Sequence, residues 1–268
     1  MKTDILYVGH EGSGSMLGYY SKLSSEVYDL DKYVGLSFGD VEFYSDRLAS
    51  CEGKILEPGV GTGRILIPLL EKGLKVDGFD VSAEMLEICR SNCEKRGLKP
   101  ILFEGNMESF SLETKYEAII VPTGTFLLLH KREDSIKALK NFYNHLTNGG
   151  KLIIDIFLQT DLKIGEISTR TWETNNGELI TLETKIIEVD YINQYTISHN
   201  RYEKWRGGSL VQTELEIFPL RWYGIEEFKL LLEQVGFENI VISADYKYGQ
   251  YPTESNQTVT FEAVTNKK

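Results

Sequence analysis

The sequence predicts an α/β fold with a doubly wound sheet, and three observations lead to this prediction. Short apolar segments alternate with amphipathic segments between residues 51 and 165. The segment at residues 118–121 is apolar on both faces, which is typical of a parallel strand covered by helices on each side. After about residue 165 the alternation ends, and strand-like segments follow one another. This change predicts an antiparallel sheet inserted into the α/β framework.

The first 50 residues are expected to form a helical lid. Residues 1–18 are rich in glycine and serine and predict a mobile segment, whereas residues 19–50 are aromatic-rich and predict helix. Tyr20 and Tyr28 lie eight positions apart, about two helical turns, so they would share roughly one face. Ordinary packing of this helix explains the pair as well as ligand contact does.

The alternating region, residues 51–165, predicts five strands with helices between them. The strands are expected at residues 54–57, 75–80, 101–104, 116–121 and 151–157, and the helices at residues 62–72, 83–96 and 133–146. Ser82 is placed to cap the second helix, and Gly73 and Gly97 stand where helices end.

The predicted insert occupies residues 166–222. Its strands are expected at residues 169–172, 179–191, 194–205 and 211–220, with hairpin turn signals at residues 175–177 and 206–208. A helix at residues 225–235 and strands at residues 240–242 and 258–263 then complete the α/β framework. The expected core therefore comprises residues 51–165 and 223–268.

Composition narrows the classes of function. The chain has 268 residues, and Lys+Arg 29 against Asp+Glu 40 gives a net charge of −11, which disfavours general nucleic-acid binding. No secretion signal is evident, and no apolar stretch approaches the roughly 20 residues of a membrane span, so we expect a cytoplasmic protein without a membrane partner. Cys89 and Cys93 are four apart, but no nearby ligand completes a metal site, and no metal is expected.

A glycine-rich loop follows the first predicted strand. It reads Glu57-Pro58-Gly59-Val60-Gly61-Thr62-Gly63, and a helix is expected after it. Glycines let a ligand approach the backbone closely, and a helix N-terminus presents free N–H groups. Asp80 ends the second strand, 23 residues after Glu57, where a carboxylate can accept hydrogen bonds from ribose hydroxyls. Together these features predict a nucleoside cofactor.

The loop also distinguishes between cofactors. The dinucleotide pattern needs glycine at position 64, where this chain has Arg64. Glu57 places negative charge beside the loop, which suits a cationic amino-acid moiety better than a pyrophosphate. Both residues favour S-adenosylmethionine over NAD, and an NAD-dependent oxidoreductase is the less favoured alternative.

The sequence resembles the class I S-adenosylmethionine-dependent methyltransferases between about residues 50 and 160. The matching stretches are residues 55–64, 78–86, 104–107, 116–125 and 146–157. The resemblance implies a Rossmann-like, mostly parallel seven-stranded sheet. Residues 122–123 depart from the N/D-P-P-Y tetrad of enzymes that methylate amino groups of nucleic acids or glutamine, which counts against those substrates.

The resemblance implies a set of cofactor-binding residues. Asp80 would bind the ribose, and Asn106 stands where many relatives carry Asp, so its amide oxygen would accept from the adenine without a charge. The candidate cofactor residues are Tyr20, Tyr28, Glu57, Gly59, Gly61, Gly63, Arg64, Asp80, Val81, Met85, Gly105, Asn106, Met107, Pro122 and Thr123.

The overall layout is similar to small-molecule N-methyltransferases of the amino-sugar and glycine N-methyltransferase groups. We therefore expect a methyl transfer to an amine or hydroxyl of a small molecule, with the insert forming part of the acceptor pocket or a homodimer contact. His130 is the candidate base, although a surface histidine that opens a helix explains it equally well. A protein- or RNA-modifying enzyme and a non-catalytic S-adenosylmethionine-binding protein are the alternatives.

Overall fold

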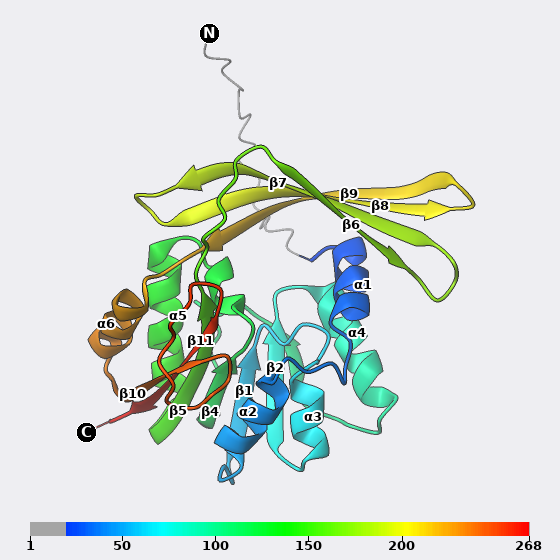
Figure 1. The fold of residues 1–268 in the computed structure, drawn as a ribbon. Helices are drawn as coiled ribbons and strands as arrows, with labels where there is room; N and C mark the ends of the chain where they lie inside the picture. The colour runs from blue at the N-terminus through cyan, green and yellow to red at the C-terminus, as the bar shows by residue number, and fades with distance from the viewer. Residues whose placement is uncertain (1–19, 268) are drawn as a thin grey trace.

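A computed structural model describes residues 20–267, which form two β-sheets with helices around the larger one (Figure 1). The segment at residues 1–18, predicted to be mobile, lies outside the described residues. The larger sheet has seven strands in the order β10-β11-β5-β4-β1-β2-β3. Its strands are β1 (Lys54–Pro58), β2 (Lys75–Asp80), β3 (Leu102–Glu104), β4 (Tyr116–Val121), β5 (Leu146–Phe157), β10 (Phe237–Ala244) and β11 (Thr258–Thr265).

The strand order creates a site for a ligand. Strands β1 to β5 pair in parallel, and only β11 runs antiparallel to its neighbours β5 and β10. The chain winds from β1 outward to β3 and then returns to lay β4 against the other side of β1. Ligands of open α/β sheets bind at such a switch point, outside the carboxyl ends of the strands.

Helices cover both faces of this sheet. They are α2 (Asp40–Leu48), α3 (Leu66–Glu71), α4 (Ala83–Glu94), the short 3-10 helix η1 (Thr125–Leu128), α5 (Arg132–His145) and α6 (Ile225–Val235). Alternate residues of β4 enter two different cores: Ile119 and Val121 pack with α5 and α6, whereas Ala118 and Ile120 pack with α3 and α4. This division confirms that the apolar segment is a strand buried on both faces.

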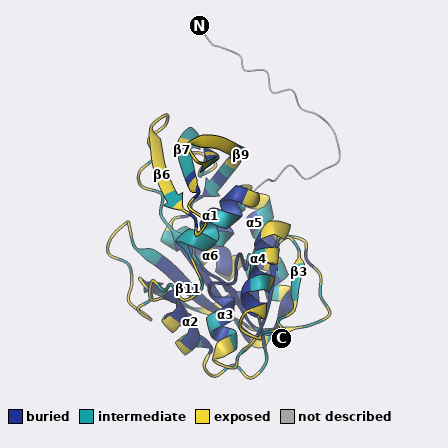
Figure 2. Ribbon diagram, turned by 90° about the vertical axis from the view of Figure 1, so that its right-hand side faces the viewer, coloured by how far each residue is buried: buried dark blue, intermediate teal, exposed yellow. Residues whose placement is uncertain are grey.

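The second sheet lies across one end of the core, with α1 (Lys22–Asp31) beneath it (Figure 1). It is antiparallel throughout, in the order β6-β7-β8-β9. Its strands are β6 (Ile167–Glu173), β7 (Leu179–Asp190), β8 (Tyr195–Arg206) and β9 (Ser209–Arg221). Leu23 and Val27 of α1 form a small core with Ile180 and Tyr202 of this sheet, whereas β6 is almost wholly exposed (Figure 2).

Several expected boundaries differ from those in the structure, and strand β10, for example, spans Phe237–Ala244 rather than residues 240–242. The helix predicted from residue 62 begins only at Leu66, because Gly59, Gly61 and Gly63 all adopt positive φ angles and extend the loop. Helix α4 ends at Glu94 rather than near residue 96, and β5 begins at Leu146 rather than at residue 151. Among residues 20–267, no helix has the length and hydropathy needed to span a membrane.

Candidate active site

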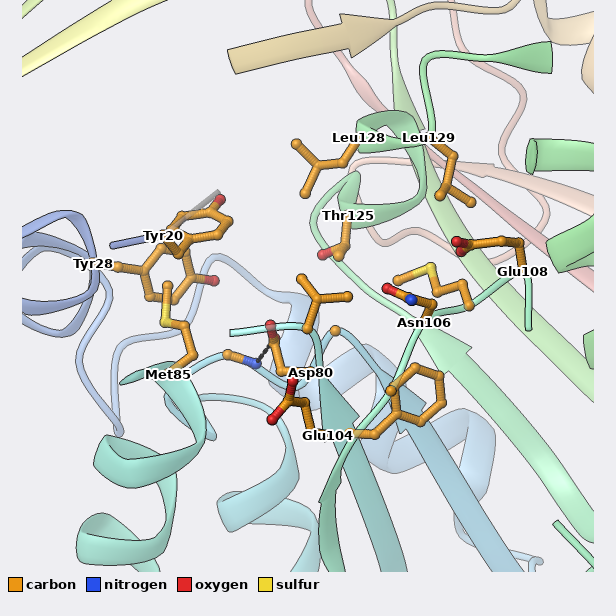
Figure 3. A pocket seen from close by; sticks show the side chains of 16 residues that line it. Tyr20, Tyr28, Asp80, Met85, Glu104, Asn106, Glu108, Thr125, Leu128 and Leu129 are labelled. Carbon is orange, nitrogen blue, oxygen red and sulfur yellow. Dashed lines mark hydrogen bonds between the residues drawn. The ribbon is translucent and has the colours of Figure 1, made fainter. Parts of the chain in front are cut away.

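A cavity of about 550 Å³ opens where β1, β2, β3 and β4 end, at the switch point of the large sheet (Figure 3). Residues from the glycine loop, from the ends of β2 and β3, from η1 and from the start of the described chain line it. Its volume lies within the range of pockets that enclose a small molecule or cofactor.

The glycine loop forms the floor of the cavity through its backbone. The N–H groups of Gly59 and Val60 both donate to the carbonyl of Phe79, at 2.8 and 3.0 Å. Gly59 has a φ of +70°, and a Cβ there would overlap Thr125 Cγ2 and lie 3.1 Å from Met107 Cε. Only glycine fits this position, so the loop passes close to the cavity without side chains of its own there.

Asp80 lies at the centre of the cavity (Figure 3). Its carboxylate accepts hydrogen bonds from the Gly61 N–H at 2.9 Å and from the Ser82 N–H at 3.0 Å. Burial raises the pKa of Asp80, while these backbone donors act in the opposite direction. Ser82 also caps α4 as predicted, since its hydroxyl accepts from the Met85 N–H at 3.1 Å.

The turn after β3 forms a second wall. Gly105, Asn106 and Met107 line the cavity, with the Asn106 side chain directed into it (Figure 3). Asn141 of α5 holds this turn, since its amide nitrogen donates to the carbonyls of Met107 and Phe110 at 3.1 and 2.9 Å. The amide of Asn106 is thereby presented to any ligand in the cavity.

Tyr20 and Tyr28 form the wall opposite this turn. Their rings are 5.7 Å apart in an edge-to-face arrangement, and both line the cavity (Figure 3). A Cβ on Gly61 would lie 3.5 Å from Tyr28 Cε1, so Tyr28 packs directly on the glycine loop. Burial raises the pKa of both phenols, so they stay neutral donors at neutral pH.

Glu57 belongs to β1, just before the glycines, and is not among the residues that line the cavity. It is 3% exposed, and its Oε2 has no hydrogen-bond partner. Burial raises its pKa well above the ordinary value, although the nearby Arg64 guanidinium acts to lower it. A buried carboxyl oxygen without a partner is costly, so Glu57 is suited to pair with a hydrogen-bond donor or a cationic group of a bound ligand.

Arg64 does not line the cavity, although the sequence predicted it as a cofactor residue. Its Nη2 pairs with Asp40 Oδ2 at 2.5 Å, and its Nη1 donates to the Leu36 carbonyl at 3.1 Å. Burial acts to raise the pKa of Asp40, but the hydrogen bond and charge of Arg64 hold it below the ordinary value. The side chain therefore joins the glycine loop to the N-terminal region, and it is buried rather than solvated.

Three further predicted cofactor residues, Gly63, Pro122 and Thr123, are not among the residues that line the cavity. A Cβ on Gly63 would lie 2.9 Å from Cys89 Sγ, so Gly63 permits close packing against α4. The Pro122 carbonyl accepts from the Thr125 hydroxyl at 2.9 Å. Thr123 has a φ of +53°, and its N–H donates to Asp155 Oδ2 at 2.8 Å. Their places indicate a role in shaping the loop ends, and cofactor contact by them stays a prediction.

His130 is not among the residues that line the cavity, although Leu128 and Leu129 before it are. Its ring lies 5.6 Å from that of Tyr195 in the second sheet, and burial lowers its pKa. A base role for His130 therefore stays a prediction that the geometry of the cavity does not support.

Sequence reasoning missed several residues of the cavity wall. Those outside the predicted set are Phe79, Glu104, Glu108, Thr125, Leu128 and Leu129. Phe79 and Glu104 lie at strand ends, directly next to the predicted residues Asp80 and Gly105. Their position next to these residues in the sequence could have indicated them. Nothing in the sequence pattern indicates that η1 turns Leu128 and Leu129 towards the cavity. Among the described residues, no group of three or more His, Cys, Asp or Glu side chains could hold a metal ion.

Comparison with known proteins identifies the family. A family model described as a methyltransferase domain matches residues 55–150. An uncharacterized methyltransferase of Geobacillus sp. (strain WCH70) is 30% identical over 147 residues, which are 54% of this chain and 67% of that protein. The chain belongs to the S-adenosylmethionine-dependent methyltransferases.

Two further relatives extend the similarity of this methyltransferase beyond the matched domain. A glycine/sarcosine N-methyltransferase of Halorhodospira halochloris is 28% identical over 196 residues, covering 72% of this chain and 69% of that protein. The solved structure of a sugar N-methyltransferase from a Streptoalloteichus species aligns with a TM-score of 0.70 at 21% identity, covering 97% of this chain and all of that chain. The fold is therefore shared over both sheets.

The cavity of the methyltransferase fits S-adenosylmethionine. Asp80, the glycine loop and Asn106 line it, so Asp80 would accept from ribose hydroxyls, the loop would offer its backbone, and Asn106 would offer an amide to the adenine. Glu57 Oε2, which is buried without a hydrogen-bond partner among the described residues, stands just before the loop, where a cationic amino-acid moiety would supply that partner. When bound, this cofactor supplies a methyl group activated by the positive charge on its sulfur.

Proposed function

We propose that the enzyme methylates the amine of a small molecule that carries no carboxylate. The observation behind this proposal is the charge of the cavity wall. Its carboxylates come from Asp80, Glu104 and Glu108, and none of the residues that line it is Lys, Arg or His. Such a wall attracts a cationic acceptor and repels an anionic one.

The chemistry of methyl transfer agrees with an amine acceptor. An acceptor attracted as an ammonium ion loses its proton to water before the reaction, and the neutral amine then attacks with its free lone pair and needs no general base in that step. A hydroxyl, in contrast, must lose a proton before or during attack. His130, the predicted base, does not line the cavity. With an amine, the chain needs only to align the two reactants and exclude water.

The walls are suited to that task. Tyr20 and Tyr28 cover one side of the cavity, and Leu128 and Leu129 of the η1 region face it from another side (Figure 3). These side chains are mostly apolar, so they exclude water around a reacting amine. The carboxylates of the wall attract the amine into the cavity. The printed names of the two relatives, which specify glycine/sarcosine and sugar N-methylation, support nitrogen as the methylated atom.

The acceptor proposal is tested with a panel of amines and S-adenosylmethionine, with products analysed by mass spectrometry. We expect methylation of amines that lack a carboxylate, such as an amino sugar, at a kcat/KM at least about tenfold above that for glycine or sarcosine. Methylation confined to amino acids, or a product methylated on oxygen, would contradict the proposal.

A charge variant sharpens this test. Replacing Glu108 by Gln should raise KM for a cationic amine about threefold, because one attractive charge is lost from the wall. Glu113→Gln is the matched control, since Glu113 is exposed and does not line the cavity. Equal KM values for the two variants would remove Glu108 from acceptor recognition.

We also propose that two chains associate through the four-stranded sheet. Strand β9 is an edge strand of this sheet, and an edge strand can pair with a strand of a second copy. Leu215 and Ile217 are exposed on the same strand. Light scattering after size-exclusion chromatography should give a dimer mass, and Leu215→Lys should shift it towards the monomer; a monomer for the unchanged chain would contradict the proposal.

A further inference from the structure

Tyr20 holds an unusual backbone conformation in the wall of the cofactor cavity. Its φ is +59°, in the left-handed region that non-glycine residues seldom adopt. Such a conformation is strained and persists only where the surroundings hold it. The contacts that hold Tyr20 therefore matter to the shape of the cavity.

Hydrogen bonds from three parts of the chain hold this residue. The carbonyl of Tyr20 accepts from the Ser82 hydroxyl at 2.8 Å and from the Ser25 hydroxyl at 3.1 Å. The next peptide N–H, that of Ser21, donates to Glu216 Oε1 at 2.9 Å. Ser82 belongs to the cofactor side, next to Asp80, whereas Glu216 belongs to β9 of the second sheet.

Alternate residues of β9 face the start of α1. Glu214, Glu216 and Phe218 are two positions apart, so they lie on one face of the strand. Glu214 Oε2 accepts from the Leu23 N–H at 2.8 Å, and the Phe218 ring lies edge-to-face with the Tyr20 ring at 6.3 Å. The strand thus contacts Tyr20 and the first turn of the helix after it.

The two carboxylates replace the helix's own cap. Helix α1 has no acidic residue in its first turn, and the Ser21 side chain makes no cap hydrogen bond within the helix. Instead the Ser24 hydroxyl donates to Glu216, and the Ser21 hydroxyl lies 2.5 Å from Glu214 Oε2 and 3.0 Å from Glu216 Oε1, within hydrogen-bond distance of both. Negative charge at a helix N-terminus is favourable, and Glu216 is only 3% exposed, so solvent screens this interaction weakly.

We propose that Glu216 is a positioning residue that holds Tyr20 in the wall of the cofactor cavity. Through it the second sheet contributes to cofactor affinity, although Glu216 is not among the residues that line the cavity. The inference rests on cofactor binding at this cavity and not on the identity of the acceptor. Failure of the acceptor proposal therefore leaves it intact.

A double-mutant cycle separates positioning from simple stabilisation. The Kd of S-adenosylhomocysteine is measured by calorimetry for the unchanged chain, Glu216→Ala, Tyr20→Ala and the double variant. We expect Glu216→Ala to raise the Kd about tenfold in the unchanged chain and less than about twofold in the Tyr20→Ala background, because Glu216 acts through Tyr20. Equal factors in the two backgrounds, or no change in the unchanged chain, would overturn the proposal.

Two further variants keep the experiment decisive. Glu183→Ala removes a glutamate of the same sheet that pairs with Arg201 at 3.0 Å, and it should leave the Kd unchanged. If Glu216→Ala does not fold, the cycle is repeated with Glu216→Gln, which keeps an acceptor oxygen but loses the charge. Its Kd should lie between those of the unchanged chain and Tyr20→Ala, and additivity with Tyr20→Ala would again overturn the proposal.

Discussion

The glycine loop and residues 20–50, for which the name lid is used from here on, both contribute to the wall of the same cavity but are built in opposite ways. The loop is made of backbone, and its bond to Asp80 spans only 19 positions in the sequence. The lid is fixed by side chains, and the bond from the Ser21 N–H to Glu216 spans 195 positions. The part of the site formed by the glycine loop and Asp80 therefore depends only on one strand–loop–strand unit. The lid, in contrast, depends on the whole chain being folded.

This difference predicts different sensitivities. The loop should fail when a side chain is added at Gly59 or Gly63, because these two glycines leave no room for a Cβ. The lid and its links to the loop should fail when a charge is removed, because buried carboxylates such as Asp40 then lose their partners.

The largest effect is expected where the two regions are joined, at Arg64. Arg64→Ala leaves Asp40 as a buried, uncompensated carboxylate, which should lower the free energy of unfolding by about 3–5 kcal/mol. Arg132→Ala is the control, since Arg132 pairs with Glu227 at 3.0 Å in a partly exposed position and should cost less than about 1 kcal/mol. Similar losses in urea denaturation for both variants would show that the buried link is unimportant.

A smaller effect is expected from a methyl group in the loop. Gly59 and Gly73 both have positive φ, but only at Gly59 would an added Cβ have neighbours within 4 Å. Both Ala variants should lose about 1 kcal/mol to backbone strain, and Gly59→Ala should lose a further 1–3 kcal/mol, roughly, to the overlap with Thr125. Equal losses in thermal unfolding would mean that the loop is not closely packed at Gly59.

The contribution of Asp155, near the end of β5, to the free energy of unfolding should depend on pH. Asp155 is fully buried, which raises its pKa to about 6, while hydrogen bonds from Thr260, Thr123 and Tyr246 act to lower it. Because the folded chain binds this proton more tightly than the unfolded chain, Asp155 adds stability as the pH falls through 6 and loses it as the pH rises. We expect a contribution about 1.4 kcal/mol larger at pH 5 than at pH 7.5.

Asp155→Asn tests this contribution. The substitution removes the titrating proton, so the difference in unfolding free energy between Asp155→Asn and the unchanged chain should move in favour of the variant as the pH rises from 5 to 7.5. Urea denaturation at the two pH values measures it. A difference that is constant with pH would mean that Asp155 does not titrate in this range.

The sequence was sufficient for the features that depend on neighbouring residues. Gly59 and Gly61 were predicted to make a close-approach loop, and both form the cavity floor. Asp80 was predicted at the tip of β2, and Ser82 was predicted to cap α4. Each of these follows from backbone geometry within a few residues, which local patterns encode.

The remaining features needed the fold. Arg64 was predicted to contact the cofactor, but its guanidinium instead forms an ion pair with Asp40, 24 positions away. Glu216 is one of 40 acidic residues in the chain, and nothing near it in the sequence indicates a helix N-terminus as its partner. Such contacts depend on how the second sheet lies across the core, and periodicity does not specify that arrangement.

The central claim, that Asp80 and the glycine loop hold S-adenosylmethionine, is tested most directly by calorimetric titration with S-adenosylhomocysteine. We expect binding to the unchanged chain and a Kd at least about tenfold higher for Asp80→Ala, because the carboxylate in the cavity is lost. An Asp80→Ala variant that folds normally and binds with unchanged affinity would contradict it.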